Sequence, residues 1–233
     1  MSTMAAQPLT FSEGRSKSKC AFVDQQANSG WRLKSPIELK DDGNVVAFDD
    51  NVLRAVLQRA LISDAAMQAD AMDIRFRPQD YLVLLAIPHT FPLRTASELL
   101  KLLLDTAQYG FKGVSIVRQP TLVLYSYDVT TGVVVDLGEE MAIVPVIDLF
   151  KNANSRNIYL TGGTSQLRGL AERLEHELAQ LAPASVPVQV LNSPWRRHSA
   201  YLGTHVIAAG DDFEKCCVNN KNLAEYLSRI DGD

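Results

Sequence analysis

A run of three valines, followed closely by an acidic residue and a glycine, constrains the fold of this chain most. Val133, Val134 and Val135 are apolar on consecutive residues, which indicates a strand buried on both faces of a sheet. Asp136 and Gly138 follow at the end of this strand, where open α/β sheets place their ligands. The sequence therefore predicts an α/β fold with a charged and accessible position at the end of a central strand.

The residues around this strand predict a meander of three consecutive strands. The expected strands and turns are, in order, a strand over 122–127, a turn at 128–130, a strand over 132–136, a turn at 137–140 and a strand over 142–146. A second signal follows, in which a short strand starting at Asn157 ends in Gly162-Gly163. The helix after these glycines has one apolar face, and we expect Thr164 or Ser165 to cap it.

Other local patterns predict strands and helices but no catalytic or metal-binding group. The apolar run Tyr81–Ile87 indicates a buried strand, and Thr95-Ala96-Ser97-Glu98 has the pattern of a capping box before a leucine-rich helix. Residues 211–233 end in an amphipathic segment suited to docking. His198 and His205 lie seven residues apart without a cysteine or acidic partner at ligand spacing, so we expect no metal site.

Composition excludes several functional classes. The 233 residues carry a net charge of −4 and show no basic face, which argues against direct nucleic-acid binding. No apolar run is long enough for a membrane span, and three cysteines form no disulfide framework, as in a reducing, intracellular compartment. Residues 1–19 are polar and are expected to form a tail.

Several segments, taken in order, resemble actin and the actin-related proteins. They are KSPIE, GNVVAFDD, LVLLAIPHTFPLRTASELLKLLLDT, LVLYSYDVTTGVVVDLG, NIYLTGGTSQLRGLAERLEHEL and SPWRRHSAYLGTHVIAA. The fourth is similar to the hairpin and second phosphate loop of that family, and the fifth to its adenosine loop. Because the matches occur in the family's order, they are more specific than any single glycine pattern.

The resemblance implies a shortened, divergent member with a reduced actin-like (ribonuclease H-like) fold, in which helices flank a mixed sheet. Few residues separate Gly30 from Lys34, and only Lys151 to Arg156 join two segments that lie far apart in actins. We therefore expect the equivalents of subdomains 2 and 4 to be missing. The expected domains are a tail over 1–19, a subdomain-1-like core over 20–131, a subdomain-3-like remnant over 132–181 and a returning C-terminal segment over 182–233.

The resemblance also implies where a nucleotide would sit. The matching cofactor-binding positions are Asp24, Asp136, Gly138, Gly162 and Gly163, and Gln119 falls on the glutamine that orients the attacking water. Each has a structural alternative: an ordinary strand and turn near Asp24, a glutamine before a proline at an element boundary, and glycines needed for a close turn.

Departures from the family pattern predict a vestigial site. The turn after Asp24 keeps one glycine and no matching lysine, and Glu139 and Glu140 replace residues of the second phosphate loop. We expect no enzymatic activity and no tightly held cofactor, with ATP and magnesium bound weakly if at all. A working site would need a partner to supply the missing wall and a cation.

The preferred hypothesis is a non-catalytic, actin-related structural subunit of a larger cytoskeletal assembly, axonemal, ciliary or dynein-linked. The family's partner groove matches Tyr125, Thr130, Tyr201 and Val206. The expected partners are protein subunits, without membrane or nucleic acid and without filament formation, at a cytoplasmic, cytoskeletal location that includes the cilium. The alternatives are a reduced ATP-binding switch or weak ATPase, and a nuclear subunit of a chromatin-remodelling complex.

Overall fold

The computed structural model describes residues 8–13, 17–22, 37–39, 45–48, 78–138, 142–149 and 157–230, the first four ranges as strands alone. The chain forms two compact units. Unit 1 comprises Met1–Val117 and Ala208–Asp233, and unit 2 comprises Arg118–Ile207. These bounds differ from the expected domains, because residues 118–131 and 182–207 both belong to unit 2.

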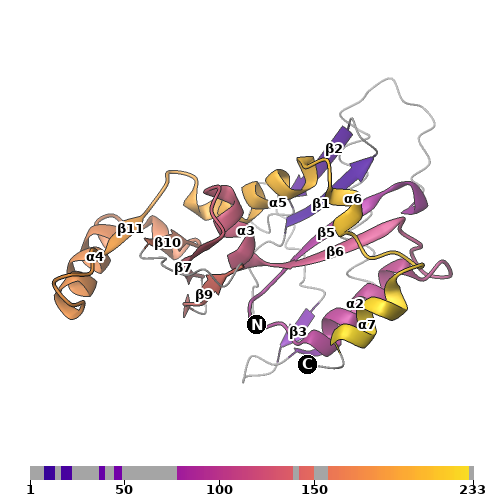
Figure 1. The fold of residues 1–233 in the computed structure, drawn as a ribbon, viewed down its shortest axis with the longest axis horizontal. Helices are drawn as coiled ribbons and strands as arrows, with labels where there is room; N and C mark the ends of the chain where they lie inside the picture. The colour runs from indigo at the N-terminus through magenta and orange to yellow at the C-terminus, as the bar shows by residue number, and fades with distance from the viewer. Residues whose placement is uncertain are drawn as a thin grey trace, which may run out of the picture. The chain divides into compact units, whose positions relative to one another are not determined.

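Unit 1 contains a four-stranded sheet in the order β2-β1-β5-β6 and a separate pair, β3-β4 (Figure 1). The strands are β1 Pro8–Glu13, β2 Lys17–Phe22, β3 Ile37–Leu39, β4 Val45–Phe48, β5 Leu82–Ile87 and β6 Gly113–Arg118. Strand β1 is antiparallel to both β2 and β5. Strand β1 lies within residues 1–19, so the expected tail contributes to the sheet.

The core of unit 1 forms where helix α2, Leu93–Leu104, packs on the sheet. Strand β5 is buried at all six positions, as its continuous apolar run predicts. The core cluster also includes Leu99, Leu100, Leu103, Leu104, Phe111 and Val114. The C-terminal residues complete it: Val114 and Val218 exchange backbone hydrogen bonds of 2.8 Å each, and Leu223 packs against the same cluster.

The remaining helices and turns of unit 1 are short. They are the 3₁₀ turn η2 Pro78–Asp80, α6 Phe213–Cys216 and α7 Leu223–Ile230. The expected capping box over 95–98 is wrong, because α2 already begins at Leu93, after an extended Pro92. Glu98 pairs instead with Arg94 one turn earlier, at 3.4 Å on the exposed face. A proline with a fixed φ starts this helix without a side-chain cap.

Unit 2 contains the mixed sheet that the sequence predicts. Its strands are β7 Thr131–Leu137, β8 Ala142–Ile143, β9 Val146–Asp148, β10 Asn157–Thr161 and β11 Gln189–Leu191. The order is β11-β10-β7-β8, and β9 also pairs with β7. Strands β11, β10 and β7 are parallel, whereas β8 and β9 run antiparallel to β7. The expected α/β class is therefore confirmed.

Three helices flank this sheet. They are α3 Gln119–Ser126, α4 Leu170–Leu181 and α5 Ser199–Ala209, and the 3₁₀ turns η3 Thr164–Gln166 and η4 Arg196–His198 precede α4 and α5. None of the described helices is long and apolar enough to cross a membrane.

The first strand of the expected meander is wrong, because residues 119–126 form helix α3. Leu122, Val123 and Leu124 are all buried, and a short continuous apolar run fits a buried helix as well as a buried strand. Pro120 stands in the first helical turn, where its missing N–H costs no hydrogen bond. The third expected strand is divided into β8 and β9, with Pro145 between them.

The helix after the two glycines also begins later than expected. Gly169 has a φ of +76° and precedes α4, which starts at Leu170. Thr164 and Ser165 belong to the intervening turn η3, so neither caps the helix.

Alternation along β7 gives the sheet of unit 2 two different faces. Val134 packs with Val123, Leu124 and Tyr159 on the face covered by α3 and α5. Val135 packs with Leu160, Ala171 and Val190 on the face covered by α4. Asp136 follows the parity of Val134, so it belongs to the face of α3 and α5.

Candidate functional site

The glycine turn after β10 lies directly against the end of β7. The two strands are parallel, and Asp136 pairs in register with Thr161. Gly162 has a φ of +92°, and a Cβ added there would overlap the carbonyl of Leu137 and lie 2.7 Å from Asp136 Oδ1. Only glycine fits this approach without strain. The Thr164 hydroxyl donates to the Gly138 carbonyl at 2.8 Å and joins the two segments.

Three of the five cofactor-binding positions that the sequence predicts are thus brought together: Asp136, Gly138 and Gly162. Gly163 is the next residue, with a φ of −62° and open space where a Cβ would lie. Asp24 lies outside the described residues. Gln119 is the half-buried first residue of α3, and within the described part of the chain its side chain forms no hydrogen bond to the turn.

The carboxyl group of Asp136 loses hydration through burial, and no nearby group among the described residues offsets this loss. Burial raises its pKa above the ordinary value, because the charged form loses hydration. Within the described residues this carboxyl accepts no hydrogen bond and forms no ion pair. A site of this kind disfavours additional negative charge unless a cation accompanies it.

Arg196 is a cation in contact with the turn, and two nitrogens of its guanidinium bind backbone carbonyls. Its Nε donates to the Ser165 carbonyl at 3.0 Å, and its Nη1 donates to the Ser193 carbonyl at 3.1 Å. In return, the Thr161 hydroxyl donates to the Arg196 carbonyl at 2.6 Å. These reciprocal bonds tie η4 to the turn after β10. The sequence contained the basic run 196–198 but no signal that Arg196 would hold the glycine turn.

The described residues around the turn supply part of what a nucleotide triphosphate needs. Such a ligand needs converging backbone N–H groups and a cation. The turn at Gly162-Gly163 offers backbone groups, and the contacting cation Arg196 already donates from Nε and Nη1 to carbonyl oxygens. No group of three metal-ligating side chains occurs among the described residues.

A second candidate surface lies on the helix pair α3 and α5, which lie side by side (Figure 1). A Cβ added at Gly203 would overlap the carbonyl of Leu122, so the two helices approach as closely as their backbones allow. This contact fixes the pair as one rigid surface.

The four predicted partner-binding residues all lie on or near this helix pair. Tyr125 is half-buried on α3, and Thr130 is exposed just before β7. Tyr201 is half-buried on α5, where its ring meets the ring of His205 edge-on and its hydroxyl lies 3.0 Å from His205 Nε2. Burial lowers the pKa of His205 below its ordinary value. Val206 is 50% exposed on the same helix.

A sequence model of the actin family matches residues 151–230, about a third of the chain. The match covers β10, the glycine turn, α4, β11, α5 and the C-terminal helices α6 and α7. It supports actin-like family membership and agrees with the mixed α/β fold of unit 2.

Proposed function

We propose that this chain is a non-catalytic, actin-related structural subunit of a larger cytoskeletal assembly, axonemal, ciliary or dynein-linked. In this proposal the chain lacks the equivalents of actin subdomains 2 and 4, does not polymerise, and resides in the cytoplasm or cilium. Its partners are protein subunits that dock on the surface formed by α3 and α5.

The close contact between Gly203 and Leu122 is the observation that supports this role most directly. Because the two helices are locked together, they present a preformed surface and lose little freedom when a partner binds. Val206 offers half-exposed apolar area there, and Tyr201 adds an aromatic ring with a polar tip, a residue type enriched at protein interfaces.

The state of Asp136 supports the non-catalytic part of the proposal. Phosphoryl transfer depends on positioning and on positive charge around the phosphates. The carboxyl of Asp136 has no charged partner among the described residues, and Arg196 is held by carbonyl oxygens. A chain with these contacts has a nucleotide site in outline only.

Nucleotide binding tests the first half of the proposal. Thermal unfolding of the purified chain is followed with and without millimolar ATP or ADP and Mg²⁺. A ligand at 100 times its Kd would stabilise the chain by roughly 2.7 kcal/mol. We expect no shift. A shift that Asp136→Ala abolishes would instead establish the nucleotide switch.

Partner binding tests the second half. Val206→Glu places a charge on the surface of α5, and Leu93→Glu places one on α2, where Leu93 is 51% exposed. We expect Val206→Glu to remove the chain from its native assembly, as seen by size-exclusion chromatography of cell extract, and Leu93→Glu to leave it there. Equal retention of both variants would contradict a docking role for α5.

A reduced ATP-binding switch is the second candidate. The observation that favours it is the close approach of Gly162 to Leu137 and Asp136, which preserves a backbone turn at the carboxyl ends of two parallel strands.

A third candidate, a subunit of a chromatin-remodelling complex, differs in location. A nuclear rather than cytoskeletal distribution of the tagged chain would favour it.

A further inference from the structure

The turn that closes helix α3 contains a strained backbone position. Asp128 has a φ of +56°, and it is the one non-glycine residue with a positive φ among the residues that the structure describes. Its N–H donates to the Tyr125 carbonyl at 3.2 Å. The next N–H, of Val129, donates to the Leu124 carbonyl, also at 3.2 Å. This pair of bonds is the Schellman closure of a helix, whose left-handed position is usually a glycine. An aspartate adopts this conformation less easily than glycine, so the surrounding structure must hold it.

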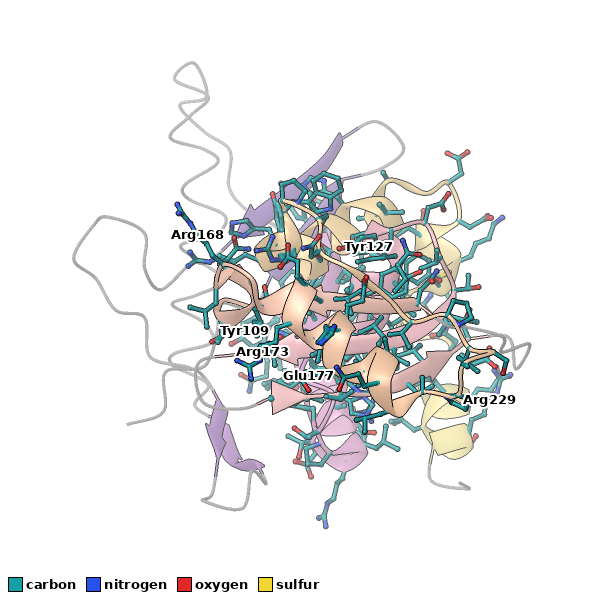
Figure 2. The ribbon with its side chains drawn as sticks, turned by 90° about the vertical axis from the view of Figure 1, so that its left-hand side faces the viewer. Tyr109, Tyr127, Arg168, Arg173, Glu177 and Arg229 are labelled. Carbon is teal, nitrogen blue, oxygen red and sulfur yellow. The ribbon has the colours of Figure 1, made fainter. Side chains whose placement is uncertain are left out.

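Tyr127 immediately precedes this position and is bound through its hydroxyl to a distant loop. The hydroxyl donates to the Ser193 hydroxyl at 2.9 Å and accepts a hydrogen bond of 3.3 Å from the Ser193 N–H. The Tyr127 ring also contacts the ring of Tyr159, with 4.8 Å between the centroids. The side chain is half-buried among its neighbours, whereas that of Arg168 is exposed and projects away from the ribbon (Figure 2).

Arg196 holds Ser193 from the other side. Its Nη1 donates to the Ser193 carbonyl at 3.1 Å, and its Nε donates to the Ser165 carbonyl at 3.0 Å, in the turn after β10. The Thr161 hydroxyl donates to the Arg196 carbonyl at 2.6 Å. A continuous series of hydrogen bonds therefore runs from the glycine turn to the end of α3. We call its members the polar network: Thr161, Ser165, Arg196, Ser193 and Tyr127.

The Tyr127 end of the polar network borders the surface proposed for partners. Tyr125 and Thr130, two of the residues expected to contact a partner, lie on either side of the strained turn. The Thr130 carbonyl accepts a hydrogen bond of 3.2 Å from the Leu149 N–H, which fixes the far end of the turn. Tyr127 fixes the near end. Loss of either contact would change where Tyr125 and Thr130 lie relative to each other.

Packing alone does not account for the hydroxyl of Tyr127. A phenylalanine would make the same ring contact with Tyr159. The tyrosine hydroxyl in addition acts both as donor and as acceptor, and the Ser193 N–H has no other acceptor among the described residues. A buried Tyr hydroxyl with both roles filled joins two segments that are 66 residues apart in the chain.

We propose that Tyr127 is a positioning residue for the surface of α3 and α5, and that the polar network couples this surface to the glycine turn. When the network is intact, the strained turn at Asp128 stays closed. When a bond is lost at either end of the network, the last turn of α3 opens more often and partner binding weakens. The consequence for partner binding rests on the proposed function, whereas the coupling is a property of the isolated chain.

Amide exchange of the purified full chain, followed by NMR, measures the coupling without a partner. Tyr127→Phe keeps the ring and removes the hydroxyl, and we expect the protection of the Val129 amide to fall at least about threefold. Thr161→Val, at the opposite end of the network, should lower the same protection. Thr164→Val is the matched control. It removes a bond of 2.8 Å from the same glycine turn to Gly138, outside the network, and should leave the Val129 amide unchanged.

Asp128→Gly separates positioning from an ordinary loss of stability. Glycine adopts a positive φ without strain, so the turn no longer depends on Tyr127. In the Asp128→Gly background, Tyr127→Phe should therefore change the protection of the Val129 amide by less than about twofold. A hydroxyl that only adds stability would have the same effect in both backgrounds. That result would overturn the proposal, as would equal effects of Thr161→Val and Thr164→Val.

Size-exclusion chromatography of cell extract then measures the effect on the native assembly. We expect Tyr127→Phe to move part of the chain to smaller fractions, and the double variant with Asp128→Gly to return it. If Tyr127→Phe lowers amide protection but stays in the assembly while Val206→Glu leaves it, the positioning role is wrong and the proposed function stands. If both variants stay in the assembly, the docking surface itself is wrong.

Discussion

Strand β5 of unit 1 and strand β7 of unit 2 each contain a continuous apolar run, but the two strands differ in how far the rest of the chain covers them. All six residues of β5 are buried, whereas Val133 and Leu137 of β7 remain partly exposed. In unit 1 the apolar surface is enclosed by residues of the same chain, including Val218 and Leu223. In unit 2 part of it is left open. Of these two central strands, β7 is the one that keeps partly exposed apolar side chains.

Removing a large side chain from the closed unit should have the largest effect on stability. Leu103 is fully buried in the core of unit 1. We expect Leu103→Ala to reduce the free energy of unfolding by about 2–5 kcal/mol, with the loss of amide-exchange protection confined to unit 1. Val133→Ala, at a half-buried position of β7, serves as the comparison and should cost about 1 kcal/mol or less. Equal losses would show that β7 is as enclosed as β5.

The glycine turn should give the next largest effect. Gly162→Ala forces a Cβ into the carbonyl of Leu137 at a positive φ, so we expect a loss of about 3 kcal/mol. Gly163→Ala is the matched control, because no atom lies within 4 Å of the added Cβ. Urea unfolding followed by tryptophan fluorescence in a Trp31→Phe background, where Trp195 is the remaining tryptophan, reports on unit 2. If both variants unfold alike, the tight approach of the turn to β7 is refuted.

Asp136→Asn should stabilise unit 2 at neutral pH by a smaller amount, on the order of 1 kcal/mol, because a charged group without a partner is removed. The folded-state pKa of this carboxyl is raised, so the folded state holds the proton more tightly than the unfolded state. Stability should therefore fall in the native chain as pH rises from the ordinary carboxyl pKa of 3.8 through the raised pKa. Thermal unfolding as a function of pH should show this fall in the native chain and not in the variant.

The smallest effect is expected at Val146 of strand β9. Val146→Thr keeps the β-branched shape and adds a hydroxyl at a position that is 72% exposed. We expect a change of less than about 0.5 kcal/mol in the free energy of unfolding of the isolated chain. A loss several times larger would mean that Val146 is covered by other residues of the chain, which would contradict its exposure.

The central strands of both units could be predicted because consecutive apolar residues indicate burial directly. The contact between Asp136 and Gly162 was also accessible from sequence, since parallel strands end at the same edge of a sheet. Helix α3 was not, because Leu122-Val123-Leu124 satisfies a buried strand and a buried helix equally well. Tertiary packing favours the helix here, namely the close contact between Leu122 and Gly203.

The role of Arg196 shows why part of the candidate site could not be predicted. Its guanidinium binds the carbonyl of Ser165, 31 residues away in the chain. Because every residue has a backbone carbonyl, the sequence does not show which carbonyl an arginine will bind. The exposure of Val146 could not be predicted for a related reason. Whether Val146 is covered depends on which helices lie over the sheet, and local periodicity carries no information about that.

The division of the chain into units sets an order for synthesis on the ribosome. Unit 2 is continuous, whereas unit 1 is completed only when Val218 reaches β6 and pairs with Val114. Residues 208–233 take a few seconds to synthesise at about 5–20 residues per second. During that interval unit 2 has its full sequence, while the cluster around Leu103 and Phe111 lacks its last members. Chaperones that shield exposed apolar surface on the nascent chain would therefore act on the cluster around Leu103 and Phe111, and release it only after Val218 has emerged.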